Sequence, residues 1–259
     1  FPRKLSPHTQ LLVDSKNGCL MFIPMKHCTL GKALCGALTL FLAVTTHARA
    51  DAVFQTPQVR AELMVEHASA APGESLWVAL ALEAIPKWHT YWRIPGDSGL
   101  PTEVRWSLPE GITAGVIHWP LPERIAYGDL MNFGYHGKVL LLTELKIAPD
   151  YAGPANPSLD ADATWLVCEE LCIPEDGAFS LPIQIDANPT LQETAAGAAI
   201  AAARAALPQE APWPVKFLRN GDTFTVSAQV GAESGQFTEA VFFPHVDGLI
   251  YNAASQDVR

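Results

Sequence analysis

Residues 75–82 read SLWVALAL, an apolar run that follows the turn signal Pro72-Gly73. Apolar residues at consecutive positions predict a strand that is buried on both faces or lies in the core of a sandwich. A second long strand is predicted at residues 138–147, which read KVLLLTELKI. These two segments place the core of the protein in β-structure.

Shorter predicted strands accompany these two. They are separated by turns such as Pro109-Glu110-Gly111 and by a longer turn or loop at residues 95–99. Several short strands with turn signals roughly every ten residues are typical of an antiparallel β-sandwich, which is therefore the predicted fold class. The shorter strands are predicted at residues 59–65, 104–108, 164–167 and 179–185.

An alanine-rich segment after the sandwich predicts a short helix. Alanine has the highest intrinsic helix propensity, and Thr190 and Glu193 have the spacing of a capping box at a helix start. We predict the helix at residues 191–206 and expect a connector that packs on the sandwich. Strand patterns then resume around the hairpin signal Asn220-Gly221-Asp222, which predicts the start of a second β-domain. Its strands are predicted at residues 215–219, 223–230 and 240–243.

The amino-terminal region has the layout of a secretory signal peptide at about residues 25–50. Lys26 and Lys32 form a positive region, residues 33–44 are apolar, and Ala48-Arg49-Ala50 is a small-x-small cleavage site. The apolar run is too short to span the roughly 30 Å of hydrocarbon in a bilayer. We therefore expect an exported protein.

The balance of charges excludes one class of function. The chain has 259 residues, with 17 Lys and Arg against 27 Asp and Glu, and a formal net charge of −10. A nucleic-acid-binding protein needs a basic face that displaces counterions from phosphates. This acidic chain does not fit that class.

Cys168 and Cys172 are the cysteines that follow the predicted signal peptide, since the other three are at positions 19, 28 and 35. An exported protein with one close cysteine pair is a candidate for a disulfide, either structural or redox-active. Chemistry in this chain is therefore expected at residues 165–175, which read WLVCEELCIPE.

The spacing of the pair leaves three interpretations open. A structural disulfide that closes so short a loop contributes only about 2 kcal/mol of chain entropy. A copper or zinc site needs a further ligand, and the nearest histidines are His136 and His245, so the fold would have to bring one close. A redox dithiol requires only that both sulfurs meet and that one of them is reachable.

Several segments carry a resemblance to a known family. The sequence resembles the amino-terminal periplasmic domain of DsbD-type thiol:disulfide interchange proteins, with a closer likeness to the branch that includes the copper-sensitivity suppressor ScsB. The likeness is good over residues 72–182 and looser elsewhere, and WLVCEELC is its most specific part. It rests on PGESLWVALALEAIPKWHTYWRIPGDSGLPTEVRWSLPEG (72–111), WPLPERIAYGDLMNFGYHGKVLLL (119–142), WLVCEELCIPE (165–175) and AVFFPHVDGLIYNAASQ (240–256).

The resemblance implies an immunoglobulin-like sandwich that carries Cys168 and Cys172 as its redox-active disulfide, with no other cofactor. It implies a periplasmic thiol:disulfide oxidoreductase that relays reducing equivalents from a membrane electron-transfer domain to periplasmic disulfide proteins. The membrane domain and a thioredoxin-like domain are the expected partners, encoded downstream in a full-length protein anchored in the inner membrane. The alternatives are a copper-binding or copper-tolerance module that uses the same cysteines and a non-catalytic β-sandwich with a structural disulfide.

One departure from the family concerns the cysteines. In the DsbD domain they are more widely spaced than Cys168 and Cys172, so the geometry toward a partner does not transfer directly. The predicted organisation has four parts. They are an upstream extension plus signal peptide (1–50), an immunoglobulin-like redox domain (51–187), a helical connector (188–208) and a truncated second β-domain (209–259).

Two aromatic segments are candidates for the surroundings of the sulfurs. Residues 127–135 lie where the DsbD domain carries a loop that caps its cysteines, so Phe133 or Tyr135 is a candidate cap. In the segment 88–93, His89 or Tyr91 is a candidate for the rim of the site, where an imidazole or hydroxyl would donate to a departing thiolate. The alternative for all four side chains is a place in the core or in a hairpin.

The two cysteines are predicted to have different roles. Cys168 follows the apolar strand end Trp165-Leu166-Val167 and should be partly buried. Cys172 leads into Ile173-Pro174-Glu175, a predicted loop that proline keeps out of the sheet ladder and that should be more exposed. Exchange requires in-line access to one sulfur, so Cys172 is predicted to join the partner and Cys168 to resolve the mixed disulfide. The DsbD resemblance implies the same order.

Overall fold

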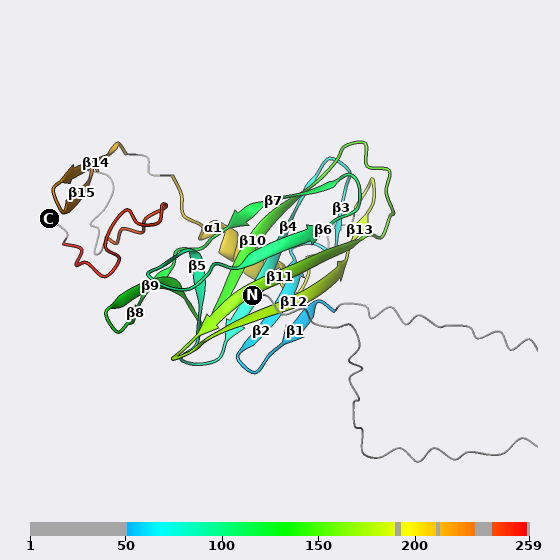
Figure 1. Cartoon of the computed structure of the whole chain (residues 1–259). Helices are drawn as coiled ribbons and strands as arrows, with labels where there is room; N and C mark the ends of the chain where they lie inside the picture. The colour runs from blue at the N-terminus through cyan, green and yellow to red at the C-terminus, as the bar shows by residue number, and fades with distance from the viewer. Residues whose placement is uncertain (1–50, 190–192, 211–212, 231–239, 258–259) are drawn as a thin grey trace, which may run out of the picture. The chain divides into compact units, whose positions relative to one another are not determined.

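The two long apolar strands lie side by side at the centre of the computed structural model (Figure 1). Strand β4 (Ser75–Ala84) pairs antiparallel with β10 (Lys138–Ile147), from Lys138 opposite Glu83 to Lys146 opposite Ser75. The structure describes residues 51–189, 193–210, 213–230 and 240–257. The predicted signal peptide lies outside these residues.

Two antiparallel sheets form the body of the fold. The first has the order β1-β2-β4-β10-β7 and the second has the order β12-β11-β5-β9-β8, with β6 also pairing with β11. The strands of the first sheet, besides β4 and β10, are β1 (Val53–Gln55), β2 (Val59–Val65) and β7 (Ile112–His118). Those of the second are β5 (His89–Gly96), β6 (Glu103–Ser107), β8 (Glu123–Tyr127), β9 (Leu130–His136), β11 (Ser158–Cys168) and β12 (Cys172–Pro182).

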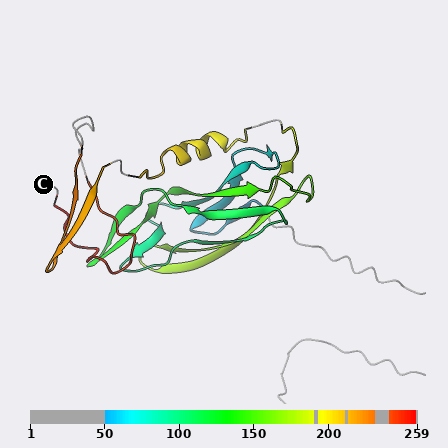
Figure 2. The same cartoon turned by 90° about the horizontal axis from the view of Figure 1, so that it is seen from above.

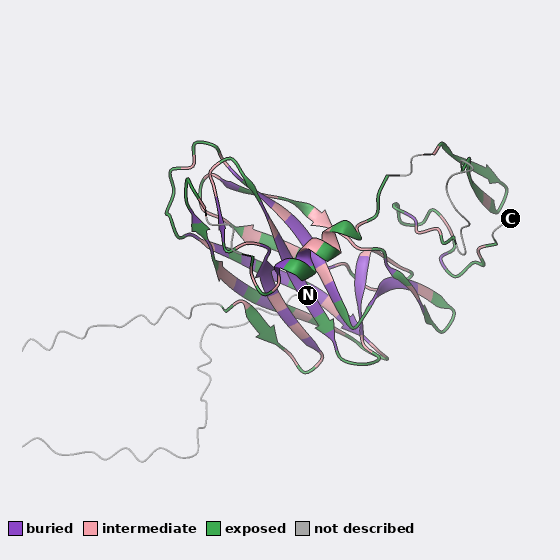
Figure 3. Cartoon of the chain, turned by 180° about the vertical axis from the view of Figure 1, so that it is seen from behind, coloured by how far each residue is buried: buried purple, intermediate pink, exposed green. Residues whose placement is uncertain are grey.

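The inner faces of the two sheets enclose one large core. Buried and exposed positions alternate along many strands, as Figure 3 shows by colour. In β11 the buried side chains at alternate positions, from Leu159 to Val167, all belong to this core. Such alternation is what a strand with one covered and one open face requires. The antiparallel β-sandwich predicted from the sequence is confirmed.

Strand β4 is buried on both faces, because a helix covers the outer face of its sheet. Leu80 and Leu82 point into the main core, whereas Ala79 and Ala81 belong to a second cluster around Ile200. Ile200 is fully buried and lies on α1 (Gly197–Ala205), which lies along this sheet in Figure 2. The predicted connector helix therefore does pack on the sandwich.

The helix begins later than the sequence predicted, at Gly197 instead of residue 191. Residues 193–194 are held by the end of β2 instead. The Thr194 hydroxyl donates to the carbonyl oxygen of Val65, its backbone N–H donates to that of Glu66, and Glu193 forms a β-bridge with His67. Thr190 of the predicted capping box lies outside the described residues, and α1 has no side-chain cap.

Other predicted boundaries also need correction. The predicted loop at Ile173-Pro174-Glu175 is part of β12, where proline is tolerated because β12 is an edge strand. Pro95 and Gly96 belong to β5 and not to the following loop. The aromatic segment 127–135 is mostly the β8–β9 hairpin, with Gly128-Asp129 at its tip.

The remaining elements are small. Strands β3 (Ser69–Ala70) and β13 (Gln184–Ile185) form a parallel pair, and β14 (Val215–Asn220) and β15 (Thr223–Ala228) form the predicted hairpin, with Gly221 at φ +59°. The predicted strand at 240–243 is wrong, since those residues are irregular. The predicted domain boundaries stay predictions.

An aromatic contact is one of the links between residues 240–257 and the sandwich. Phe243 packs edge-on against Trp92 and Phe133, with ring centroids 6.0 and 5.4 Å apart. Gln256 holds this segment together, because its side chain accepts from and donates to the backbone of Phe242. The apolar pattern at 240–243 that predicted a strand therefore reflects packing of Phe243 on the sandwich and not strand pairing.

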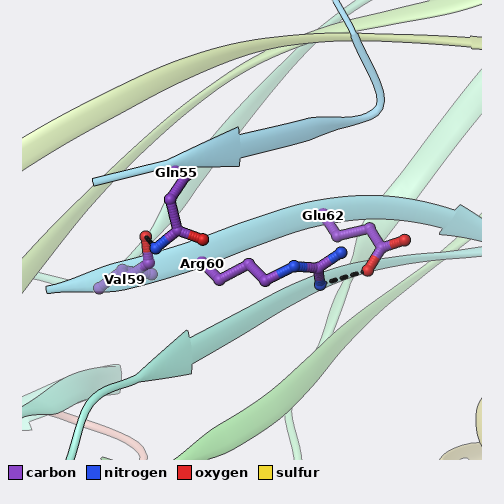
Figure 4. Close-up of polar contacts among 4 residues, drawn as sticks. All are labelled: Gln55, Val59, Arg60 and Glu62. Atoms are coloured by element: carbon purple, nitrogen blue, oxygen red, sulfur yellow. Dashed lines mark hydrogen bonds and ion pairs between the residues drawn. The ribbon is translucent and has the colours of Figure 1, made fainter. Parts of the chain in front are cut away.

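The polar contacts of Arg60 and Gln55 are local. On β2 the Arg60 guanidinium bonds the Glu62 carboxylate two residues along the same strand, and Gln55 reaches the carbonyl oxygen of Val59 (Figure 4). Both side chains of the ion pair are partly exposed, so the pair adds little stability. The core, and not surface charge, holds the sandwich together.

Replacing Ile200 with alanine should lower the free energy of unfolding by about 2–5 kcal/mol, because a fully buried side chain is removed from the helix–sheet contact. Chemical denaturation measures the change. As a control, Val116→Ala alters a side chain that is 75% exposed and should change stability by less than about 0.5 kcal/mol. Equal effects from the two variants would contradict the docking of α1.

Candidate functional site

The β11–β12 hairpin brings Cys168 and Cys172 together. The two strands pair along their whole length, and their last pair is Cys168 opposite Cys172, with Cα atoms 4.2 Å apart. A disulfide joins the two sulfurs across the connection Glu169-Glu170-Leu171. The backbone pairing already places the cysteines opposite each other, so the hairpin does not need the disulfide for its register.

The two sulfurs differ in their access to solvent. Cys168 is 2% exposed, because β11 has β12 on one side and β5 on the other. Cys172 is exposed at the start of the edge strand β12, beside Leu171, whose side chain is 76% exposed. The predicted difference in burial is confirmed, whereas the roles assigned to the two cysteines are not tested by it.

Strand β5 contributes the neighbours of the disulfide. His89 is the residue opposite Cys168 in the β5–β11 pair. Directly opposite residues share one face of a sheet, and residues two apart along a strand share it too. His89 and Tyr91 therefore lie on the same outer face as both sulfurs, whereas Trp92 points into the core.

Tyr91 contacts the exposed cysteine. Its hydroxyl lies 3.6 Å from Sγ of Cys172, although the side chain as a whole is 1% exposed. Burial raises the pKa of Tyr91, partly offset by a hydrogen bond with Ser98. The hydroxyl thus keeps its proton near neutral pH and can donate it in a hydrogen bond to a thiolate at Cys172.

The Tyr91 ring packs against a glycine that leaves room for it. Gly99 has φ +98°, and a Cβ there would lie only 2.2 Å from Cε1 of Tyr91. The loop that carries Gly99 is fixed by the buried Asn132, whose side-chain oxygen accepts from the backbone N–H and the hydroxyl of Ser98. The position of the Tyr91 hydroxyl therefore depends on this loop as well as on β5.

His89 is buried next to the disulfide. Its side chain is 3% exposed, and its ring lies 5.1 Å from that of Tyr91 and 5.6 Å from that of His136. Burial, with a smaller contribution from His136, lowers the pKa of His89 to about 4. The imidazole is therefore neutral near pH 7.

The structure brings four of the six predicted site residues together: the two cysteines, His89 and Tyr91. It does not bring Phe133 and Tyr135 to them. Both are buried in the main core, on the opposite face of the second sheet, and the Tyr135 hydroxyl donates to the carbonyl oxygen of Pro120. Among the contacts of the described residues, none joins either ring to a sulfur.

Tyr127 is the hairpin residue that does reach the cysteine connection. Its hydroxyl donates to the carbonyl oxygen of Glu170, at 2.8 Å, from the last position of β8. Tyr127 lies inside the segment in which the sequence indicated a cap. Side chains alternate between the two faces along β8 and β9, so Tyr127 lies on the face opposite to Phe133 and Tyr135. The sequence alone did not reveal this difference, because it depends on the register of the hairpin.

The base of the same hairpin is bound to the carboxyl-terminal segment. The Arg124 guanidinium donates to the carbonyl oxygens of Asn252 and Ala254, at 2.8 and 3.1 Å. The Asn252 amide in turn donates to Asp97, whose other carboxylate oxygen accepts the backbone N–H of Met131. The β8–β9 hairpin is therefore held both at its tip and at its base.

Two further observations concern the described residues only. In the described part of the chain, no three His, Cys, Asp or Glu side chains are grouped as a metal site requires. No helix among the same residues is long and apolar enough to cross a membrane.

Comparisons with known proteins place the sandwich among similar domains. The family model of the N-terminal domain of thiol:disulfide interchange protein DsbD matches residues 60–184. The crystal structure of the N-terminal periplasmic domain of ScsB from Proteus mirabilis is 24% identical, with a TM-score of 0.51, and the match covers 70% of each chain. That likeness shows a shared immunoglobulin-like fold.

Two other solved structures match less well. The yeast GGA1 GAE domain is 11% identical with a TM-score of 0.31, covering 50% of this chain and 96% of that one. The periplasmic chaperone SfaE is 10% identical with a TM-score of 0.24, covering 66% and 87%. Scores this low carry no argument. No curated protein sequence matches the chain.

Replacing Tyr91 with phenylalanine should raise the pKa of the Cys172 thiol in the reduced protein by about one unit, because a hydrogen bond to a charged group is lost. The pH dependence of alkylation by iodoacetamide measures this shift. Tyr135→Phe is the matched control, because its hydroxyl bonds Pro120 on the core side. If the midpoint of the alkylation curve is unchanged in the Tyr91 variant, the hydroxyl does not stabilise the Cys172 thiolate and Tyr91 serves in packing only.

Replacing Tyr127 with phenylalanine should speed reduction of the disulfide by dithiothreitol about two- to ten-fold, since one hydrogen bond that restrains the cysteine connection is lost. Tyr151→Phe removes a similar exposed bond, from Tyr151 to the carbonyl oxygen of Pro154, and should leave the rate unchanged. Equal rates in both variants would show that Tyr127 does not restrain the site.

Proposed function

Because residues 60–184 form a domain of the DsbD N-terminal family, we propose that this chain exchanges disulfides with partner proteins through Cys168 and Cys172. The observation that carries the proposal is the asymmetry of the disulfide: one cysteine is buried and the other is exposed at the end of an edge strand. Exchange needs one sulfur that a partner can attack in line and a second one close enough to resolve the intermediate.

The exchange proceeds in two steps. In the reduced protein the Cys172 thiolate attacks a partner disulfide, forming a Cys172–partner bond and releasing one partner thiolate, which takes a proton. Cys168 then attacks Sγ of Cys172, which forms the Cys168–Cys172 disulfide and releases the second partner thiol. The partner gains two electrons and two protons, and the cysteine pair loses them.

Tyr91 supports the first step. Its hydroxyl lies within hydrogen-bond distance of Sγ of Cys172, and a donor to a thiolate favours the charged form. Glu169 and Glu170, between the cysteines, act in the opposite direction, because nearby negative charge disfavours a thiolate. We expect fast exchange only with partners that compensate this negative charge when they dock.

The structural alternative explains less of the geometry. A disulfide that closes a loop of a few residues contributes about 2 kcal/mol through chain entropy. Here the strands on both sides already pair at every position from Ser158 opposite Pro182 onward. A purely structural bond in this place would also leave the contact between the Tyr91 hydroxyl and Cys172 without a function.

The family suggests where the domain works and with which proteins. The ScsB structure is that of a periplasmic domain, and we propose the periplasm for this chain as well. We propose that a thioredoxin-like domain is one exchange partner and that the electrons come from a membrane electron-transfer domain. The chain then passes them on to periplasmic disulfide proteins.

The proposal predicts which sulfur is trapped. The probe is a thioredoxin with a single exposed cysteine that carries thionitrobenzoate, and Cys19, Cys28 and Cys35 are replaced by serine. Cys168→Ala should accumulate a mixed disulfide with the probe, because Cys172 attacks and nothing resolves the product. Cys172→Ala should react at least about ten-fold more slowly, because its remaining sulfur is buried.

Absorbance of released thionitrobenzoate and non-reducing gels give the two readouts. The protein with both Cys168 and Cys172 should release the dye but retain no mixed disulfide. The reverse pattern in the single variants would exchange the two roles. Absence of reaction in all of them would rule out the exchange function.

A further inference from the structure

One buried group beside the disulfide has no part in the first exchange step. Nε2 of His89 is buried and has no hydrogen-bond partner. A buried polar atom without a partner is unfavourable, so its persistence calls for an explanation. His89 is the residue opposite Cys168, and a disulfide sulfur has no proton to donate.

Each sulfur therefore has its own polar neighbour on β5. The Tyr91 hydroxyl contacts Cys172, whereas His89 stands directly opposite Cys168. Side chains opposite each other in an antiparallel pair have Cβ atoms about 4.5–5.5 Å apart. Reduction of the disulfide creates a thiol at Cys168, opposite the residue whose imidazole nitrogen lacks a partner.

We propose that His89 accepts the proton of the Cys168 thiol when Cys168 resolves the mixed disulfide. This inference rests on the exchange function proposed above. The proton moves from Cys168 Sγ to Nε2 of His89, and the thiolate attacks Sγ of Cys172. The Cys168–Cys172 bond forms, the Cys172–partner bond breaks, and the partner thiolate leaves and takes up the proton.

The surroundings of His89 suit a neutral acceptor. The titratable groups that face it are Tyr91 on β5, Cys168 on β11 and His136 on β9, and His136 is itself bonded to Glu123 of β8 at 2.9 Å. Burial and His136 hold the pKa of His89 at about 4 in the disulfide form, so the ring is unprotonated near pH 7. A thiolate formed opposite the ring raises that pKa, because opposite charges stabilise each other.

A buried cysteine needs such an acceptor more than an exposed one. Cys168 is 2% exposed, so water has little access to its thiol. Burial also disfavours the thiolate, which raises the pKa of a cysteine in apolar surroundings. A proton acceptor buried beside Cys168 takes the place of water as the acceptor. Once protonated, it also offsets the cost of a buried thiolate.

The test follows oxidation of the reduced chain by oxidised glutathione, with Cys19, Cys28 and Cys35 replaced by serine. Acid quenching and mass spectrometry separate formation of the Cys172–glutathione disulfide from its resolution by Cys168. If neither step occurs, the exchange function itself fails. If both steps occur and neither depends on His89, only the present inference fails.

His89→Gln and His89→Phe distinguish proton transfer from packing. Glutamine can still hydrogen-bond a thiol but does not accept its proton, and phenylalanine does neither. At pH 7 we expect both variants to slow resolution about 10- to 100-fold and to leave formation of the mixed disulfide within about two-fold. The difference in resolution rate between the variants and the unaltered protein should shrink as the pH approaches about 8.5, where a free thiol ionises without a proton acceptor.

His118→Gln is the matched control, because that imidazole packs on Trp77 and belongs to the other sheet. It should behave like the unaltered protein. A normal resolution rate in His89→Gln would assign His89 a hydrogen-bonding role only and overturn the proposal. A slowdown of equal size at every pH would overturn it as well.

A measurement on the unaltered site covers the case in which both variants fail to fold. Nuclear magnetic resonance titration of the His89 ring gives its pKa in the oxidised and the reduced protein. We expect the pKa to fall by about one unit on reduction, because the Cys168 thiol then donates a hydrogen bond to Nε2 and so stabilises the unprotonated ring. The same pKa in both forms would overturn the proposal.

Discussion

The antiparallel pairing of β11 with β12 is the constraint on which the site depends. The last pair of this hairpin is Cys168 opposite Cys172, so backbone hydrogen bonds bring the two sulfurs together. The position of the hairpin in its sheet then makes them unequal. Strand β12 lies at the sheet edge and exposes Cys172. Strand β11 lies inside the sheet, between β12 and β5, and pairs with β5 at Cys168.

The alternation of side chains along strands decides which residues join the sulfurs. His89 and Tyr91 share the outer face with the cysteines, and Phe133 and Tyr135 point into the core. A shift of one residue in the register of β5 would reverse this arrangement, because side chains on a strand alternate between faces. Asn132 adds to this precision by fixing the loop against which the Tyr91 ring lies, and Gly99 leaves room for that ring.

The β8–β9 hairpin connects the site to distant parts of the chain. Tyr127 at its tip bonds the backbone between the cysteines, and Arg124 near its base bonds the backbone of residues 252 and 254. Phe243 packs against Phe133 of the same hairpin. The carboxyl-terminal segment therefore helps to hold the strand pair that reaches the cysteine connection.

The sequence alone determined the sandwich, the packed helix, the cysteine pair and the difference in burial between Cys168 and Cys172. Each of these follows from local pattern: the apolar run at 75–82, the alanine-rich segment, and the apolar strand end before Cys168. The helix start at Gly197 did not follow, because Thr194 is bound to the end of β2, far away in the sequence.

Only the tertiary structure decided which aromatic residues face the sulfurs. The segment 127–135 was recognisable as aromatic, but the strand register separates Tyr127, which bonds Glu170, from Phe133 and Tyr135 in the core. The place of His89 opposite Cys168 likewise depends on the pairing of two residues that lie more than seventy positions apart in the sequence. Local patterns specify that strands form, whereas the pairing partner and register are set by packing across the whole sheet.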